Sequence, residues 1–344
     1  MTMHHESQER APQAVRRLGL YLPPALLLML ALAWCGFWLY SAQRATAELA
    51  NLKTMEAARG RVWDCADQSI VGFPFRIELH CSSVQLEATP DGGPMRIRTG
   101  ALHAATQIYA PTLLLADIDG PLTVEANGAT SHASWDNLRL SVRFAGQLER
   151  LSLTMSKPQI DVAAAAGDRL ASAAKGAEFH LRYDPARPAD DKAVDLAFQL
   201  TELSSPALNA LTGTSEKLDM GIAGVASKLA DLPPQGWHHL LESWRHAGGV
   251  FTVESGKIAK GALQIETQGT LSLDPAHRVQ GKLDVSASGI GPLIARFGGG
   301  GVTPLLGPLL TRKDGTPVKW PLQMQDGRIQ LGPFRTGPVL APLY

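Results

Sequence analysis

A run of 23 residues without a charge, Leu18–Tyr40, lies near the start of this 344-residue chain. At a rise of about 1.5 Å per residue, a helix of this length crosses a hydrocarbon core of about 30 Å with some tilt. Tyr21 lies near one end of the run and Trp34 and Trp38 near the other, as is typical of the aromatic belts at the two membrane interfaces. The run therefore predicts a single transmembrane anchor.

The basic residues around this run predict its orientation. Arg16 and Arg17 directly precede it, whereas the 15 residues that follow it contain only Arg44 and Lys53. Because basic flanks are retained on the cytoplasmic side, we expect residues 1–17 in the cytoplasm and the bulk of the chain on the other side of the membrane.

Three other interpretations of the run fit less well. The apolar core of a signal peptide has about 7–15 residues, although Ala45-Thr46-Ala47 resembles a cleavage site and leaves removal open. A lipoprotein site at Leu32–Cys35 needs a small residue where Trp34 stands. A buried core helix rarely reaches this length. We expect an uncleaved signal-anchor at residues 18–40.

Residues 41–59 are rich in alanine and alternate in charge sign, which predicts that the helix continues beyond the membrane as a short stalk until Gly60. The hydrophobic period then changes from 3.6 to 2. This is seen where Phe73, Phe75, Ile77, Leu79 and Cys81 alternate with Pro74, Arg76, Glu78 and His80. The alternation predicts a strand with one apolar and one solvated face, and residues 60–344 form the predicted periplasmic β-rich domain.

Similar short runs recur along the rest of the chain and predict its strands. They are Val84–Ala88, Met95–Thr99, Ala105–Tyr109, Leu122–Ala126, Leu138–Phe144, Leu148–Met155, Glu178–Tyr183, Val194–Leu200, Phe251–Ile258, Leu263–Leu273, Lys282–Ser288 and Arg328–Leu331. Turn dipeptides such as Asn127-Gly128 fall between the runs, because these residues accept positive φ. The predicted fold class is therefore mainly β: a large, curved, antiparallel sheet that forms an open groove, a sandwich or a barrel.

Few segments have a helical pattern. Gly236–His246 places Trp237, Leu240, Leu241 and Trp244 on one face, which predicts an amphipathic helix. Pro292–Phe297 and Pro304–Leu310 predict two short helices on either side of a glycine loop, Gly298–Gly301.

Composition excludes two classes of function. The chain has 32 basic and 32 acidic residues, so it offers no excess of positive charge to a nucleic acid. Its three cysteines are too few for a disulfide scaffold or a cysteine-rich zinc site. Cys35 lies within the anchor and is interpreted as an apolar filler.

Cys65 and Cys81 lie outside the membrane in the predicted orientation, where conditions in a bacterium are oxidising. A disulfide between them closes a loop of about 16 residues and stabilises the fold by about 3 kcal/mol. A redox function is the alternative, but the pair lacks the C-x-x-C spacing. We predict a structural disulfide.

Candidate catalytic and metal residues are weak. No nucleophile elbow, Walker A loop, dinucleotide fingerprint, H-E-x-x-H or EF-hand occurs. His239, Glu242 and His246 share one side of the predicted helix and have donor types that suit zinc, but a solvated helix face has the same composition. Asp190-Asp191 is an adjacent acid pair in a loop-like stretch, where carboxylates are usually solvated. We predict no catalytic, cofactor or metal site.

Two signatures give a family resemblance. Gly60-Arg61-Val62-Trp63-Asp64-Cys65, followed by Gly72-Phe73-Pro74-Phe75-Arg76 and Cys81, resembles a proteobacterial family, domain-of-unknown-function family 2125. The segment Trp244–Gly249 and the strand that ends in Gly269–Asp274 also fit. The resemblance implies a bacterial inner-membrane location with the main domain in the periplasm, and it brings no known activity. The later strand pattern is similar to that of AsmA-like envelope proteins, which are thought to present a lipid-lined β-groove to the periplasm.

Three functions follow from these observations. The first is binding or transfer of lipid, with phospholipid as the candidate ligand and Phe73, Phe75, Ile77 and Leu79 as candidate lining residues; an ordinary β-core is the simpler interpretation of those four. The second is a non-enzymatic assembly or scaffold protein that contacts other envelope proteins through sheet edges. The third, an envelope hydrolase, has no candidate residues.

Overall fold

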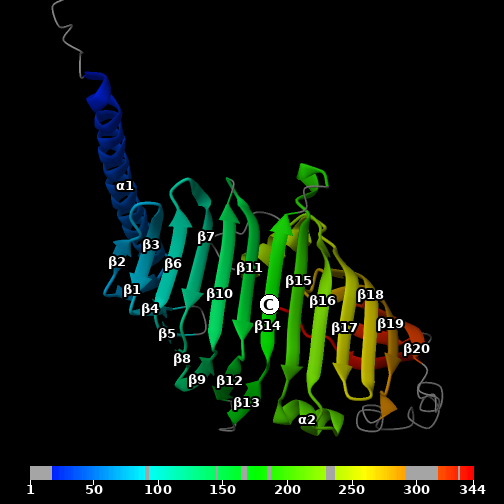
Figure 1. Cartoon of the computed structure of the whole chain (residues 1–344). Coiled ribbons are helices and arrows are strands. Elements are labelled where there is room, and N and C mark those ends of the chain that lie inside the picture. The colour runs from blue at the N-terminus through cyan, green and yellow to red at the C-terminus, as the bar shows by residue number, and fades with distance from the viewer. Residues whose placement is uncertain are drawn as a thin grey trace, which may run out of the picture.

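The computed structural model describes residues 18–89, 93–144, 146–163, 169–183, 187–229, 237–291, 317–331 and 334–344. These residues form an N-terminal helix and a mainly β domain of two antiparallel sheets, neither of which closes into a barrel (Figure 1). The predicted fold class is confirmed, and its barrel option is excluded for the described residues.

The predicted anchor and stalk form one unbroken helix, α1 (Leu18–Ala58). Its part Tyr21–Ala58 is long and apolar enough to cross a membrane, and none of its most apolar stretch is buried. Gly60 ends the helix with a φ of +74°, and its N–H donates to the carbonyl of Ala57 at 3.0 Å. The chain then enters the first strand at once.

The smaller sheet has seven strands within the described residues. In spatial order they are β1 (Arg61–Ala66), β4 (Ser83–Ala88), β5 (Met95–Thr99), β8 (Leu122–Ala126), β9 (Ala129–Ser134), β12 (Gln159–Ala163) and β13 (Arg169–Ala173).

The larger sheet has fifteen strands, again within the described residues. In spatial order they are β2 (Ser69–Val71), β3 (Arg76–Cys81), β6 (Leu102–Gln107), β7 (Ala110–Ile118), β10 (Asn137–Phe144), β11 (Leu148–Ser156), β14 (Gly176–Tyr183), β15 (Val194–Leu203), β16 (Leu218–Ala226), β17 (Phe251–Lys260), β18 (Leu263–Leu273), β19 (Val279–Ser288), β20 (Val318–Gln325), β21 (Arg328–Leu331) and β22 (Phe334–Val339).

Pairs of strands alternate between the two sheets along the first half of the chain. β2 and β3 belong to the larger sheet, β4 and β5 to the smaller one, β6 and β7 to the larger one, and so on to β14. The connections where the chain changes sheet are short, as at Ser82 between β3 and β4. The smaller sheet is therefore joined to the larger sheet along the line formed by the lower ends of its strands, which we call the lower edge of the larger sheet (Figure 1).

The register of the larger sheet separates apolar from polar side chains over its whole length. One row of directly paired positions crosses twelve strands, from β3 to β20: Leu79, Ala104, Ala116, Leu140, Leu153, Phe179, Phe198, Ile222, Gly256, Thr267, Val285 and Trp320. The next row on the other face is His80, His103, Asp117, Arg139, Thr154, Glu178, Gln199, Gly221, Lys257, Glu266, Ser286 and Lys319. Since side chains alternate between faces, one face is apolar and the other polar.

A disulfide shows how the sheets face each other. Cys65 of β1 and Cys81 of β3 are joined, with their Cα atoms 5.3 Å apart. Cys81 shares its face with Leu79, and Cys65 is directly paired with Val84 of the smaller sheet. The bond therefore lies in the angle between the sheets, and the apolar faces of both sheets point into this angle. We call these two facing surfaces together the inner face.

The C-terminal half has a small packed core and two short helices. Leu263, Ala287 and Ile290 are buried against Ile265 and Trp320. β20–β22 turn away from the plane of the preceding strands (Figure 1), and α3 (Trp237–His246) connects β16 to β17. It matches the helix predicted at Gly236–His246.

The second helix, α2 (Pro206–Thr212), lies at the lower edge of the sheet in Figure 1. The side chain of Lys260, which is only 1% exposed, reaches a residue of this helix. The ammonium of Lys260 donates to Asn209 Oδ1 at 2.9 Å and to the carbonyl of Glu216. Backbone and amide acceptors thus satisfy a buried cation.

Several predicted segments differ from the structure. The strand predicted over residues 73–81 begins only at Arg76, because Pro74 has no N–H for the ladder and a turn is closed by the Arg76 N–H on the Gly72 carbonyl at 2.9 Å. The run predicted at Ala105–Tyr109 is instead the end of β6 and a hairpin turn. The predicted segments Pro292–Phe297, Gly298–Gly301 and Pro304–Leu310 lie outside the described residues.

Candidate functional site

The inner face is incompletely buried. Trp63, Ile160 and Ile222 are 40%, 46% and 36% exposed to solvent. Leu153 and Phe198 are half-buried. The chain exposes 22596 Å², about 1.7 times the value expected for a compact monomer of this mass. A continuous, partly exposed apolar surface of this kind is a candidate binding site.

The four residues predicted to line a lipid site divide into two pairs. Ile77 and Leu79 lie on β3, half-buried, and point to the inner face with Cys81. Phe73 and Phe75 precede β3 and are 55% and 57% exposed. The structure therefore places only Ile77 and Leu79 on the inner face.

Phe73 and Phe75 contact α1 instead. The ring of Phe75 lies 6.0 Å from that of Trp34, and the ring of Phe73 lies 5.6 Å from that of Trp38. The indole N–H of Trp34 donates to the Pro74 carbonyl at 2.9 Å, and that of Trp38 donates to the Arg76 carbonyl at 2.8 Å. The tryptophans of the predicted aromatic belt thus fix the β domain to the end of the apolar run of α1. Period-2 alternation alone cannot distinguish this turn from a strand.

The predicted metal trio is only partly brought together. Glu242 lies 2.8 Å from His246 and 3.5 Å from His277, whereas no contact joins it to His239. Within the described residues no group of three or more suitable side chains could hold a metal ion.

The carboxylate of Glu242 is occupied by other partners. It accepts hydrogen bonds from Arg245 at 2.5 Å and from the hydroxyl of the last residue, Tyr344, at 2.7 Å. These two donors hold the pKa of Glu242 well below its usual range. The arrangement therefore attaches the C-terminal tail to α3, with the Tyr344 ring stacked 4.5 Å from His277. Sequence reasoning missed this contact, since the residues are about 100 positions apart.

The acid pair Asp190-Asp191 lies in a short 3-10 helix, Ala189–Asp191. Asp191 is 3.8 Å from the guanidinium of Arg187, and Asp190 is exposed. The two carboxylates thus lie at the surface of a connection.

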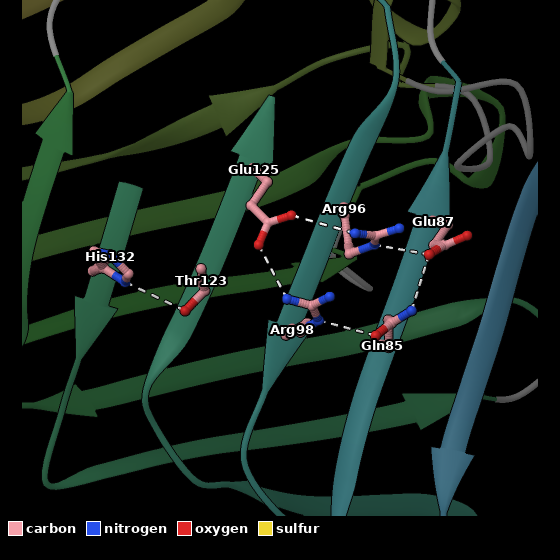
Figure 2. A network of polar contacts seen from close by, with 7 residues as sticks. All are labelled: Gln85, Glu87, Arg96, Arg98, Thr123, Glu125 and His132. Atoms are coloured by element: carbon pink, nitrogen blue, oxygen red, sulfur yellow. Dashed lines mark hydrogen bonds and ion pairs between the residues drawn. The ribbon is translucent and has the colours of Figure 1, made fainter. Parts of the chain in front are cut away.

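A polar network covers the outer face of the smaller sheet (Figure 2). Arg96 donates to Glu87 at 2.8 Å, and Arg98 donates to Glu125 at 3.0 Å. Glu125 is also 3.5 Å from Arg96, so it joins the two arginines. Exposed pairs of this kind contribute little each, and their effect is to align β4, β5 and β8 across the sheet.

In the part of the chain that the structure describes, one long apolar helix precedes two unclosed antiparallel sheets with a partly exposed apolar face, so the protein is of the mainly β class. No curated protein and no solved structure shows significant similarity to the chain. One family model, described as an uncharacterized protein conserved in bacteria (DUF2125), matches residues 38–339. The chain belongs to this family, which confirms the predicted family.

Proposed function

We propose that this chain is a periplasmic protein anchored in the bacterial inner membrane that binds lipid by its acyl chains along the inner face. The observation that carries the proposal is the apolar row across twelve strands, since its side chains keep partial exposure in the middle of the larger sheet. Each methylene of an acyl chain placed there contributes about 0.8 kcal/mol by leaving water.

The dimensions of the row favour a long apolar ligand. Twelve strands are separated by eleven spacings of about 4.8 Å, which gives a length of about 53 Å. One leaflet offers an acyl chain only about 15 Å. The inner face therefore has room for several acyl chains in line.

Membrane location and the periplasmic side rest on three features: α1, the basic residues before it, and the disulfide. Structural disulfides persist in oxidising compartments, and Cys65–Cys81 is formed. A C-terminal alkaline phosphatase fusion is expected to be active. If alkaline phosphatase were inactive at the C-terminus and a cytosolic reporter fused there were active, the periplasmic location would be contradicted.

Photo-crosslinking in whole membranes tests the binding site. We expect the full chain with Phe198→benzoylphenylalanine, on the inner face, to form lipid adducts detected by mass spectrometry. The matched control is Gln199→benzoylphenylalanine, the next residue on the same strand, which faces the polar side. Equal lipid yields at both positions, or none at Phe198, would refute binding along the inner face.

A scaffold function is the second candidate, because an unclosed sheet leaves edge strands. Within the described residues β13 is the last strand of the smaller sheet, with a bridge to Ser204 at Ala173 alone, and its residues are mostly exposed. An exposed edge can accept a strand from another envelope protein. Protein adducts at Leu170→benzoylphenylalanine, without lipid adducts at Phe198, would favour this candidate. Both candidates are non-enzymatic, since the sequence contains no catalytic motif.

A further inference from the structure

One edge of the larger sheet, the upper edge in Figure 1, carries aromatic residues on successive turns. Phe73 and Phe75 precede β3, Tyr109 is at the tip of the β6–β7 hairpin, and Phe144 ends β10 before the next hairpin. Tyr109 and Phe144 are 68% and 47% exposed. The Ile108 N–H donates to the Phe75 carbonyl at 3.1 Å, which joins the first two turns. We call these turns the aromatic edge.

Three arginines lie side by side next to this edge, on the polar face. Arg143 of β10 is directly paired with Arg150 of β11, and Arg150 is directly paired with Arg182 of β14. Like charges in directly opposite positions destabilise a sheet. Asp195 of β15 offsets the charge of Arg182, whereas Arg143 and Arg150 place two guanidinium groups side by side, which suits an anionic partner.

The surroundings of this row are also basic. Arg143, Arg150, Arg182, Arg187 and Lys192 line a hollow of about 710 Å³ together with one acid, Glu149. Arg182 is paired with Asp195 at 2.8 Å, and Arg187 is 3.8 Å from Asp191. Basic side chains thus gather around this hollow, and Arg143 and Arg150 are the two that the docking proposal uses.

The membrane helix meets the sheet at this same edge. Trp34 and Trp38 bond to the backbone of the turn at Pro74–Arg76. Tryptophans at the end of an apolar run lie at the level of the lipid headgroups. The aromatic edge is therefore held at this level, and aromatic residues beside cations are the composition that binds an anionic membrane surface.

We propose that the aromatic edge and the arginines behind it dock on the anionic headgroups of the membrane in which α1 is anchored. The inference rests on the proposed anchor and is independent of acyl-chain binding on the inner face. Docking at this edge leaves the smaller sheet, hinged at the opposite edge, directed away from the membrane.

The test uses the full chain with Tyr109→benzoylphenylalanine in nanodiscs of phosphatidylcholine, with and without phosphatidylglycerol. We expect lipid adducts at Tyr109 that increase severalfold with phosphatidylglycerol. Each basic residue near an anionic surface changes binding by about fivefold. Arg143→Glu/Arg150→Glu is therefore expected to reduce the adduct yield at least tenfold.

The matched control is Lys282→Glu/Lys319→Glu, the same change of charge on the same face of β19 and β20. It is expected to leave the yield unchanged. Arg143→Gln/Arg150→Gln removes charge without adding repulsion and serves if the reversed variant does not fold. The same yield in both lipid compositions, or equal losses in both reversed variants, would overturn the proposal.

Two further readouts separate the explanations. If inorganic phosphate alone protects the arginine strands from hydrogen exchange, and phosphatidylglycerol has no further effect, the hollow is a small-anion site and the docking proposal is wrong. Lipid adducts at Tyr109 without adducts at Phe198 support docking while they exclude acyl-chain binding on the inner face. Lipid adducts at Phe198 without adducts at Tyr109 exclude docking and leave acyl-chain binding on the inner face supported.

Discussion

Removing the disulfide between Cys65 and Cys81 is expected to destabilise the β domain by about 3 kcal/mol. The bond closes a loop of 16 residues, and the loss of loop-closure entropy in the unfolded chain is about 10 cal/mol/K, which is about 3 kcal/mol at room temperature. The bond also fixes the first strand of the smaller sheet to the larger sheet. We therefore expect the angle between the sheets to open first at this end.

The assay compares full-length Cys65→Ala/Cys81→Ala with the parent chain in detergent, by urea unfolding and by protease cleavage within β1–β5. Dithiothreitol added to the parent chain is expected to reproduce the effect of the double variant and to leave the variant unchanged. Cys35→Ser is the control, because Cys35 is a free thiol in α1. A double variant as stable as the parent, or one that dithiothreitol still destabilises, would refute the reasoning.

Three more substitutions test other parts of the fold. Asn209→Ala removes an acceptor from the buried Lys260 and is expected to lower the free energy of unfolding in urea by about 1–3 kcal/mol. Adding Lys260→Met to this variant should recover part of that loss, and no recovery would contradict the contact. Lys175 and Lys217 lower the pKa of Glu202 to about 2. The stability that this lowered pKa contributes is present above pH 4.5 and is lost as the pH falls toward 2. Glu202→Gln should therefore make the free energy of unfolding less dependent on pH in this range, and an unchanged dependence would be evidence against these ion pairs. Gly281→Ala places a Cβ against the Thr270 carbonyl at a φ of +145° and should lower the melting temperature clearly. Gly176→Ala, whose Cβ meets only the Met155 carbonyl at 3.6 Å, should change the melting temperature little. Equal effects of the two substitutions would show that the close approach between β18 and β19 is absent.

The fold was predictable where the alternation of residues is strong. Met95–Thr99 and Leu263–Leu273 alternate clearly and match β5 and β18. β9 and β13 consist largely of alanine, serine and polar residues and have no apolar face that a period could reveal. The division into two sheets was not predictable either, because it depends on bends at short connections such as Ser82.

The candidate sites were predictable only in part. The disulfide followed from two cysteines and the predicted compartment. The arginine row could not be found, because Arg143, Arg150 and Arg182 become neighbours only through the registers of β10, β11 and β14. Phe73 and Phe75 belonged to the right alternation, but Pro74 interrupts the ladder, and their contact with Trp34 and Trp38 joins segments about 40 residues apart.

The alternation of strand pairs between the sheets makes the architecture modular. From β2 to β13, each four successive strands form a unit with two strands in each sheet, and neighbouring units pair with each other in both sheets. As in solenoid proteins, duplicating or deleting a unit leaves the remaining pairings intact. Relatives of different chain length can therefore differ by about 10 Å of span per unit while they keep the same cross-section. Chain length thus sets the reach of such a protein from the bilayer surface or along it.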